Sequence, residues 1–164
     1  ANLYVLNHLA REQMEDLGIS RMTLPLELNS RELETLGCEG MELYVYGYLP
    51  AMVSAQCIVR TTKGCTKQPE VLKMRDRTGK DLPVKNHCRF CYNTIYNPSP
   101  LSLLGQEKLI RRLAPGALRL AFTLETPEQM KAVLDAFPDQ FLHGEETRDL
   151  FKDFTRGHFK RGVE

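Results

Sequence analysis

The chain has 164 residues, of which 42% are hydrophobic and 26% charged, and its formal net charge is +1. These values are ordinary for a globular protein of one domain or slightly more. A net charge this small excludes a strong long-range electrostatic attraction to nucleic acid or to a membrane surface. No apolar run reaches membrane-spanning length. The N-terminus lacks the pattern of a signal peptide, so we expect a cytoplasmic protein.

Three strands are predicted in the first fifty residues, each a short run that is apolar or rich in tyrosine and valine. They are Leu3–Leu6, Met22–Leu28 and Glu42–Leu49. The sequence starts almost at once on the first strand, whereas natural termini are usually looser. We therefore expect the C-terminal part of a larger protein. The exposed edge of its first strand would pair with the missing N-terminal part or with a second copy.

A helix is predicted after each of the first two strands. Asn7 is a good N-cap for the first, and Gly18 ends it. Asn29 and Glu32 have the spacing of a capping box for the second, which Gly37 ends. Strands separated by helices of this length indicate βαβ units and a parallel sheet.

The middle third, residues 51–100, differs in composition, because it holds four of the five cysteines and four of the nine prolines. Short strands are predicted at Val71–Met74 and Leu82–Val84, joined by a turn at Asp76–Gly79. The remainder shows no clear periodicity. We expect an irregular insert whose order depends on a bound metal.

The last third returns to an α/β pattern. A helix is predicted at Leu103–Leu113, followed by a strand with one buried face at Leu118–Leu124. Thr126 and Gln129 then form a capping box at the start of a helix that Pro138 stops.

Four cysteines have the spacing of a thiolate site. Cys88 and Cys91 form a C-x-x-C pair, whose tight turn lets two sulfurs face one ion. Cys57 and Cys65 are separated by seven residues, wider than the two to four typical of a zinc ribbon. Four thiolates suit either tetrahedral zinc or an iron–sulfur cluster. The wide pair favours a cluster, and we expect the 4Fe–4S type, with zinc as the alternative.

Other roles for the cysteines are less favoured. A thioredoxin-like redox pair at Cys88 and Cys91 would need an apolar strand leading into it, and none is present. The four could also be reduced structural residues. Cys38, near the end of a predicted helix, is expected to pack as a small hydrophobe.

Two further residues are candidates for catalysis or binding. Glu27 lies near the end of a predicted strand and could act as a general acid or base, although a solvated carboxylate is the more ordinary role. His158 lies in a basic, aromatic C-terminal tail and could contact substrate or RNA phosphate, although an exposed tail histidine is more ordinary.

The segment from Glu42 to Arg60 resembles the signature of the collagenase-like peptidase family, family U-32. The positions in register are Glu42, Tyr44, Gly47, Leu49, Cys57 and Val59. The chain departs from the signature at Tyr48, Pro50, Ala55 and Arg60, and Pro50 stands where the signature has a cysteine. Asp76–Gly79, the C-x-x-C pair, Tyr96–Leu101 and Phe154–Val163 also resemble one branch of this family.

The resemblance implies an α/β fold in three parts. Residues 1–50 would be the last units of a (β/α) barrel, 51–100 a four-cysteine metal or cluster insert, and 101–164 a small α/β unit with a tail. It also implies a peptidase of unassigned catalytic type. Some relatives are linked to cysteine-bound iron–sulfur clusters and to hydroxylation of RNA bases or of a quinone precursor.

Three functions remain open at this point. The chain could belong to a peptidase acting on extended peptides, to an iron–sulfur hydroxylase of RNA bases or a quinone precursor, or to a non-catalytic zinc-stabilised module. In the first two cases we expect the full-length protein, rather than this chain alone, to be active on its peptide or RNA substrate.

Overall fold

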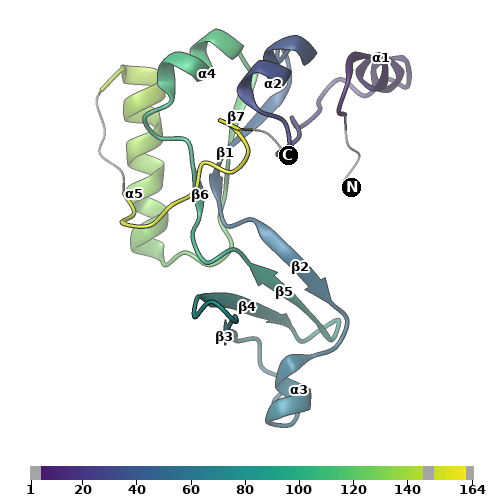
Figure 1. Cartoon of the computed structure of the whole chain (residues 1–164), viewed down its shortest axis with the longest axis vertical. Coiled ribbons are helices and arrows are strands. Elements are labelled where there is room, and N and C mark those ends of the chain that lie inside the picture. The colour runs from purple at the N-terminus through teal and green to yellow at the C-terminus, as the bar shows by residue number, and fades with distance from the viewer. Residues whose placement is uncertain (1–4, 146–149, 162–164) are drawn as a thin grey trace. The chain divides into compact units, whose positions relative to one another are not determined.

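The computed structural model describes residues 5–145 and 150–161 and shows a mixed α/β fold with two sheets (Figure 1). The chain divides into two compact units. Unit 1 comprises Ala1–Gly47 with Leu101–Glu164, and unit 2 comprises Tyr48–Pro100. The predicted first and last parts thus share one unit. Among the described residues, none of the helices combines the length and apolar character that a bilayer crossing needs.

A three-stranded sheet forms the centre of unit 1. Its middle strand is β1 (Glu42–Gly47), with β7 (Ala117–Ala121) parallel on one side and β6 (Leu101–Ser102) antiparallel on the other. Single parallel bridges join Thr23 to the start of β1 and Thr155 to β6. The sheet is open, and the described residues form no closed barrel.

The described part of unit 1 also contains four α-helices, and a single π-helical turn extends the last of them (Figure 1). They are α1 (His8–Asp16), α2 (Ser30–Leu36), α4 (Glu107–Leu113) and α5 (Pro127–Pro138), followed by the turn η1 (Asp139–His143).

The predicted helix starts are confirmed in α1, α2 and α5. The side chain of Asn7 accepts a hydrogen bond from the backbone N–H of Ala10 at 2.9 Å. Asn29 with Glu32 and Thr126 with Gln129 both form complete capping boxes. These caps supply hydrogen-bond partners for backbone N–H groups that a helix start leaves unpaired. For this reason the starts of these helices could be predicted from the sequence.

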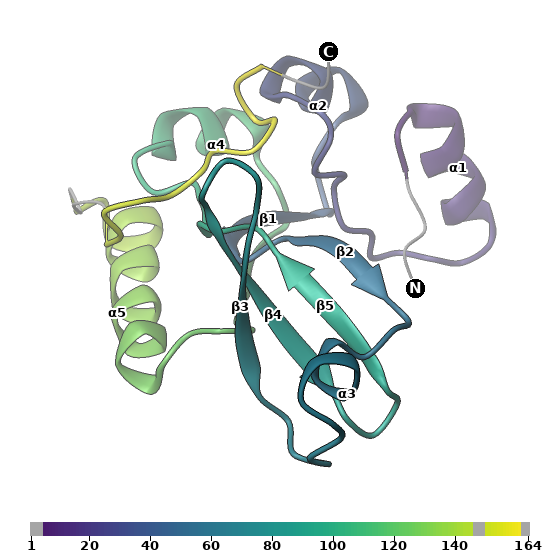
Figure 2. The same cartoon turned by 60° about the horizontal axis from the view of Figure 1, so that its bottom comes forward.

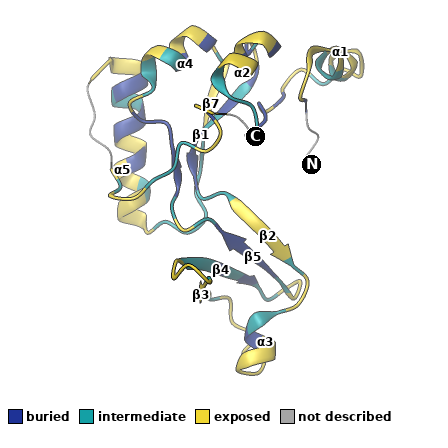
Figure 3. Ribbon diagram, in the orientation of Figure 1, coloured by how far each residue is buried: buried dark blue, intermediate teal, exposed yellow. Residues whose placement is uncertain are grey.

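The core of unit 1 centres on Tyr46 of β1, which is fully buried. Its ring lies 5.8 Å from the ring centroids of Phe122 and Phe137, and 5.5 Å from that of Phe151. Phe137 belongs to the buried side of α5, together with Val133 (Figure 3). Aromatic rings from the sheet, α5 and the C-terminal segment therefore pack as one cluster.

Two strand predictions in the first part are wrong or lie outside the described residues. Met22–Leu28 makes only the single bridge at Thr23, although Met22 and Leu24 are buried. Pro25 has no N–H to continue a ladder, so the segment is buried without pairing as a strand. Half of the predicted strand Leu3–Leu6, residues 3 and 4, lies outside the described residues, and its last two residues are not in a strand.

Two predicted elements of the last part are shorter than expected. The helix begins at Glu107 instead of Leu103, because the backbone N–H of Leu103 donates to the carbonyl of Val45 in β1. The strand ends at Ala121, and none of its residues is buried. The prediction of a buried face was wrong because β7 is the outer strand of the sheet, where one side lacks a neighbour.

Unit 2 is a four-stranded antiparallel sheet with one short helix (Figure 2). The strand order is β2 (Pro50–Ser54), β5 (Tyr92–Tyr96), β4 (Asp81–His87) and β3 (Val71–Arg75), and the helix is α3 (Ile58–Thr62). The predicted irregular insert therefore contains a regular four-stranded sheet. The sequence concealed this because β2 is exposed along most of its length, whereas β5 is mostly buried (Figure 3).

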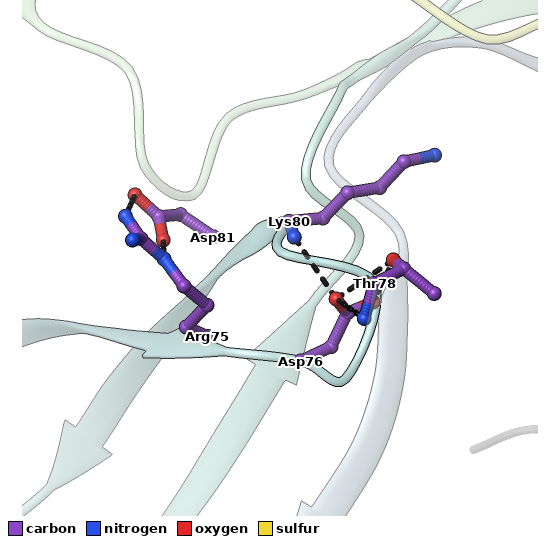
Figure 4. A network of polar contacts seen from close by, with 5 residues as sticks. All are labelled: Arg75, Asp76, Thr78, Lys80 and Asp81. Atoms are coloured by element: carbon purple, nitrogen blue, oxygen red, sulfur yellow. Dashed lines mark hydrogen bonds and ion pairs between the residues drawn. The ribbon is translucent and has the colours of Figure 1, made fainter.

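The predicted turn at Asp76–Gly79 is confirmed between β3 and β4 (Figure 4). The carboxylate of Asp76 accepts hydrogen bonds from the backbone N–H groups of Thr78 and Lys80, at 2.8 and 2.9 Å. A hydrogen bond from the Thr78 hydroxyl, followed by that from Lys80, lowers the pKa of Asp76. An aspartate that bonds its own turn in this way fixes the hairpin locally, which explains why the sequence predicted it.

Candidate four-cysteine site

The C-x-x-C pair occupies the turn between β4 and β5. The last paired residues of these strands are His87 and Tyr92, so the two cysteines lie within a four-residue hairpin loop. The backbone N–H of Phe90 donates to the carbonyl of His87 at 3.0 Å, and Cys91 has a φ of 54°. The loop turns back so tightly that the sulfur of Cys91 lies 3.8 Å from the carbonyl oxygen of Cys88.

The second pair lies at the two ends of α3. Cys57 is the residue before the first turn of this helix, and Cys65 follows its end after Gly64. Val59, within α3, is buried and anchors the helix. Cys57 is half-buried and Cys65 is exposed. The seven-residue gap that looked irregular in the sequence is thus spanned largely by a helix.

Buried Asn93 in β5 links the start of α3 to the sheet. Its side-chain nitrogen donates to the backbone carbonyl of Gln56, the residue before Cys57, at 2.6 Å. Its side-chain oxygen is also buried and has no hydrogen-bond partner among the described residues. This contact brings Cys57 to the end of the sheet where the C-x-x-C loop lies.

Buried Asn86 in β4 links the segment after Cys65 to the same end of the sheet. Its side-chain oxygen accepts from the backbone N–H of Glu70, and its side-chain nitrogen donates to the carbonyl of Gln68 at 3.3 Å. The thiol of Cys88 donates to the same carbonyl at 2.9 Å. Both segments that carry cysteines of the second pair are therefore bonded to the strands around the first pair.

The pKa of the Cys88 thiol is raised above its ordinary value. Removal of the sulfur from water is the largest cause, followed by the negative charges of Cys57, Cys65 and Cys91, with a final contribution from Glu70. Each of the other three sulfurs is thus close enough to oppose ionisation of Cys88 electrostatically. Four thiolates in this region would repel one another unless a cation lay among them.

The sulfurs are nevertheless not arranged as a cage for one ion. Within residues 5–145 and 150–161, no group of three or more His, Cys, Asp or Glu side chains has an arrangement that could hold a metal ion. Zinc would require four sulfurs at ~2.3 Å from one point. In a multi-iron cluster each cysteine binds a different iron, so the sulfurs lie further apart. The soft thiolate set is chemically suited to either centre.

Cys38 plays the packing role expected for it. It belongs to unit 1, its side chain is 1% exposed, and its thiol donates to the carbonyl of Leu33 at 3.3 Å. Burial, with a smaller contribution from the charge of Glu39, raises its pKa to about 11. This thiol is therefore held in its neutral form near pH 7.

Glu27 and His158 both lie in unit 1, whereas the four cysteines lie in unit 2. One carboxylate oxygen of Glu27 is buried without a hydrogen-bond partner among the described residues. His158 is exposed, but its neighbour Phe159 is buried and accepts a hydrogen bond from the N–H of Ser30. The tail is thus docked against the start of α2. The catalytic or binding roles of Glu27 and His158 stay predictions.

Unit 1 also contains a shallow cavity of about 280 Å³. It is lined by Arg21, Thr23, Glu42 and Gly116, among others, and it lies at the amino ends of β1 and β7. Binding sites in parallel α/β sheets form at the opposite, carboxyl ends of the strands. The cavity is therefore a weaker candidate than the cysteine-bearing end of unit 2.

Sequence reasoning missed Asn86 and Asn93, although a signal was present. Asparagine is depleted in strands, yet these two residues flank the C-x-x-C loop within runs that form β4 and β5. Buried polar side chains in a sheet usually have a specific bonding role.

No family model matches the chain, and comparisons with curated proteins and with solved structures give no match. The resemblance to the collagenase-like peptidase family rests on the sequence motifs alone.

Proposed function

We propose that unit 2 binds an iron–sulfur cluster of the 4Fe–4S type through Cys57, Cys65, Cys88 and Cys91. The observation that supports this most strongly is the bonding of the two cysteine-bearing segments to each other. Asn93 fixes Gln56 beside Cys57, and the Cys88 thiol bonds Gln68, three residues after Cys65. Cysteines that served only as packing residues would not need to be assembled around one partly exposed loop.

The chain's own residues prepare this site in two ways. The hairpin loop holds Cys88 and Cys91 on one side, and α3 separates Cys57 and Cys65 on the other. A bound cluster supplies one-electron redox chemistry. The negative charge of the thiolates would attract the iron ions of the cluster. The positive charge of the iron would in turn reduce the repulsion between the thiolates. Loading would therefore stabilise unit 2, because the site is assembled only in the folded state.

We further propose, from the motif resemblance, that the chain is the C-terminal part of an enzyme of the collagenase-like peptidase family. In that protein unit 1 would continue the last units of a (β/α) barrel. The parallel pair of β1 and β7, with α4 in the connection between them, supports this reading. The catalytic groups and the peptide or RNA substrate would then belong mainly to the remainder of the protein.

Zinc is the second candidate, and one feature favours it. A C-x-x-C pair in a tight hairpin loop, with the second cysteine at positive φ, is a suitable half-site for a structural zinc ion. In that case unit 2 would be a stabilising module without redox chemistry.

Anaerobic loading separates these proposals. The chain is purified without oxygen, incubated with iron and sulfide or with zinc, and analysed for bound elements. A cluster predicts about four iron and four sulfide per chain with a brown colour. One zinc per chain and no iron would support the zinc module. Failure to retain either would overturn both proposals.

Cys88→Ser and Cys38→Ser form a matched pair for this test. Cys88→Ser should release the centre, whereas Cys38→Ser should retain it because Cys38 packs in unit 1. Equal loss in both variants would contradict the assignment of the four ligands.

The family assignment needs a separate experiment on a longer protein that contains this chain. Cleavage of extended peptides that survives removal of iron would support the peptidase. Hydroxylation of an RNA base or quinone precursor that is lost with any of the four cysteines would support the hydroxylase. Neither activity in the longer protein would overturn the enzyme proposal.

A further inference from the structure

Asn86 is the buried polar residue that lies closest in sequence to the C-x-x-C loop on the β4 side. Its side chain is 2% exposed, and every polar atom of its carboxamide has a partner. The oxygen accepts from the N–H of Glu70, and the nitrogen donates to the carbonyl of Gln68 and to the sulfur of Cys88, at 3.3 and 3.5 Å. The amide is therefore fixed in orientation by two backbone contacts, with its remaining N–H directed at a sulfur.

Cys88 differs in this respect from the other three proposed ligands. In the part of the chain that the structure describes, no side-chain or backbone N–H donates to the sulfur of Cys57, Cys65 or Cys91. The thiol of Cys88 itself donates to the carbonyl of Gln68. A metal-bound thiolate has no proton to donate, so on ligation this sulfur can only accept, and the amide of Asn86 is already in place to donate to it.

We propose that Asn86 is a positioning residue of the thiolate centre, which orients Cys88 and raises the reduction potential of the bound cluster through an N–H···S hydrogen bond. This inference rests on the proposed function of unit 2. A hydrogen bond to a ligating sulfur withdraws negative charge from it and so favours the reduced, more negative state of the centre. Because the hydrogen bond falls on only one of the four sulfurs, the centre becomes electronically asymmetric.

A purely structural role for Asn86 makes a different prediction. Asn86 and Asn93 are both buried, and both bond backbone groups of the segment between β2 and β3. Only Asn86 also bonds a sulfur. If the backbone contacts were all that mattered, loss of either side chain would loosen the segment and affect the cluster in the same way. Asn93 is therefore the matched control.

The first test is an anaerobic redox titration of the iron–sulfur-loaded chain. Asn86→Leu keeps a similar side-chain volume and removes the N–H donor, and Asn93→Leu is its control. The inference predicts a lower reduction potential for the cluster bound by Asn86→Leu. Asn93→Leu should loosen the segment before Cys57 and so lower the iron and sulfide content, without lowering the potential of the cluster that is bound. Equal potentials in all three proteins, or equal shifts in the two variants, would overturn it.

A second measurement uses the unaltered chain and does not depend on how the variants fold. The protein is labelled with ¹⁵N, loaded with cadmium-113, and the side-chain amide of Asn86 is observed by NMR. The hydrogen bond predicts a scalar coupling between cadmium and one Asn86 amide proton, with no such coupling at Asn93. Bound cadmium without coupling at Asn86 would overturn the inference while leaving the proposed centre intact. Failure to bind cadmium together with failure to retain iron and sulfide would count against the centre itself and so against both.

Discussion

The side-chain nitrogen of Asn93 donates a hydrogen bond to the backbone carbonyl of Gln56 across 37 positions of sequence, at 2.6 Å. The strand pairing of Ser54 with Asn93 places the two segments next to each other, and this hydrogen bond holds the chain in place just before Cys57. Because the asparagine is fully buried, its amide has no water to replace this partner.

Asn93→Ala should therefore destabilise unit 2. We expect a loss of about 1 kcal/mol in unfolding free energy, since the Gln56 carbonyl loses its shorter hydrogen bond and keeps only the one from the Ser54 hydroxyl at 3.4 Å. Hydrogen exchange should rise most in the segment from Gln56 through α3. Asn97→Ala is the control, because that side chain makes no hydrogen bond among the described residues. Equal effects of the two substitutions would show that the Gln56 contact is unimportant.

Thr126→Ala tests the capping box of α5. The threonine side chain accepts from the N–H of Gln129, and the Gln129 side chain accepts from the N–H of Thr126. Its loss should reduce the unfolding free energy by about 1 kcal/mol, measured by urea denaturation. Thr126→Ser keeps a hydroxyl at the same position and should remain near the original stability. A serine variant as unstable as the alanine variant would mean that the hydroxyl is not the stabilising group.

Phe137→Ala tests whether α5 contributes to the aromatic core. The side chain is 3% exposed and its ring contacts those of Tyr46 and Phe141. We expect a loss of roughly 3–5 kcal/mol, because a large cavity would form. Leu134→Ala on the same helix, where the side chain is 50% exposed, should cost much less. Similar small losses at both positions would contradict burial of this face.

The buried thiol of Cys38 predicts a particular loss of stability at alkaline pH. Its pKa is about 11 in the folded chain against an ordinary value of 9.0. Below pH 9 the thiol is neutral in both states. As the pH rises from about 9 to 11, the unfolded chain loses this proton more readily, so the unfolding free energy should fall by ~2 kcal/mol.

Urea denaturation at several pH values, with Cys38→Ala as the comparison, measures this effect. Tyrosine and lysine residues also titrate in this range, so the informative quantity is the difference in pH dependence between the two proteins. The unaltered chain should lose more stability than the variant between pH 9 and 11. Parallel pH curves would mean that burial does not hold the Cys38 thiol neutral.

Features that depend on neighbours in the sequence could be predicted well. The capping boxes need only residues three positions apart, such as Asn29 and Glu32, and the Asp76 turn bonds itself. Strand pairing is different, because the partner of Ser54 lies at Asn93 and nothing near Ser54 indicates it. The exposed β2 also lacks the alternation of polar and apolar residues that marks a half-buried strand.

The candidate site shows the same division. Cysteine spacing predicted Cys57, Cys65, Cys88 and Cys91 as one set, because thiolate ligands have recognisable patterns, and their shared ligation stays a prediction. The hydrogen-bond partners of Asn86 and Asn93 could not be predicted, since they are backbone groups at distant positions. The apolar residues Met22 and Leu24 led to the prediction of a strand. Both are buried as expected for a strand, but they lie outside any strand.

Thiol protection measures the central claim most directly. The chain is alkylated without denaturant, before and after anaerobic loading with iron and sulfide, and each cysteine is quantified by mass spectrometry. We expect Cys57, Cys65, Cys88 and Cys91 to become protected together, in proportion to bound iron, while Cys38 reacts slowly in both states because it is buried. Protection of Cys88 and Cys91 alone, or of none of the four at full iron loading, would contradict a shared four-cysteine centre.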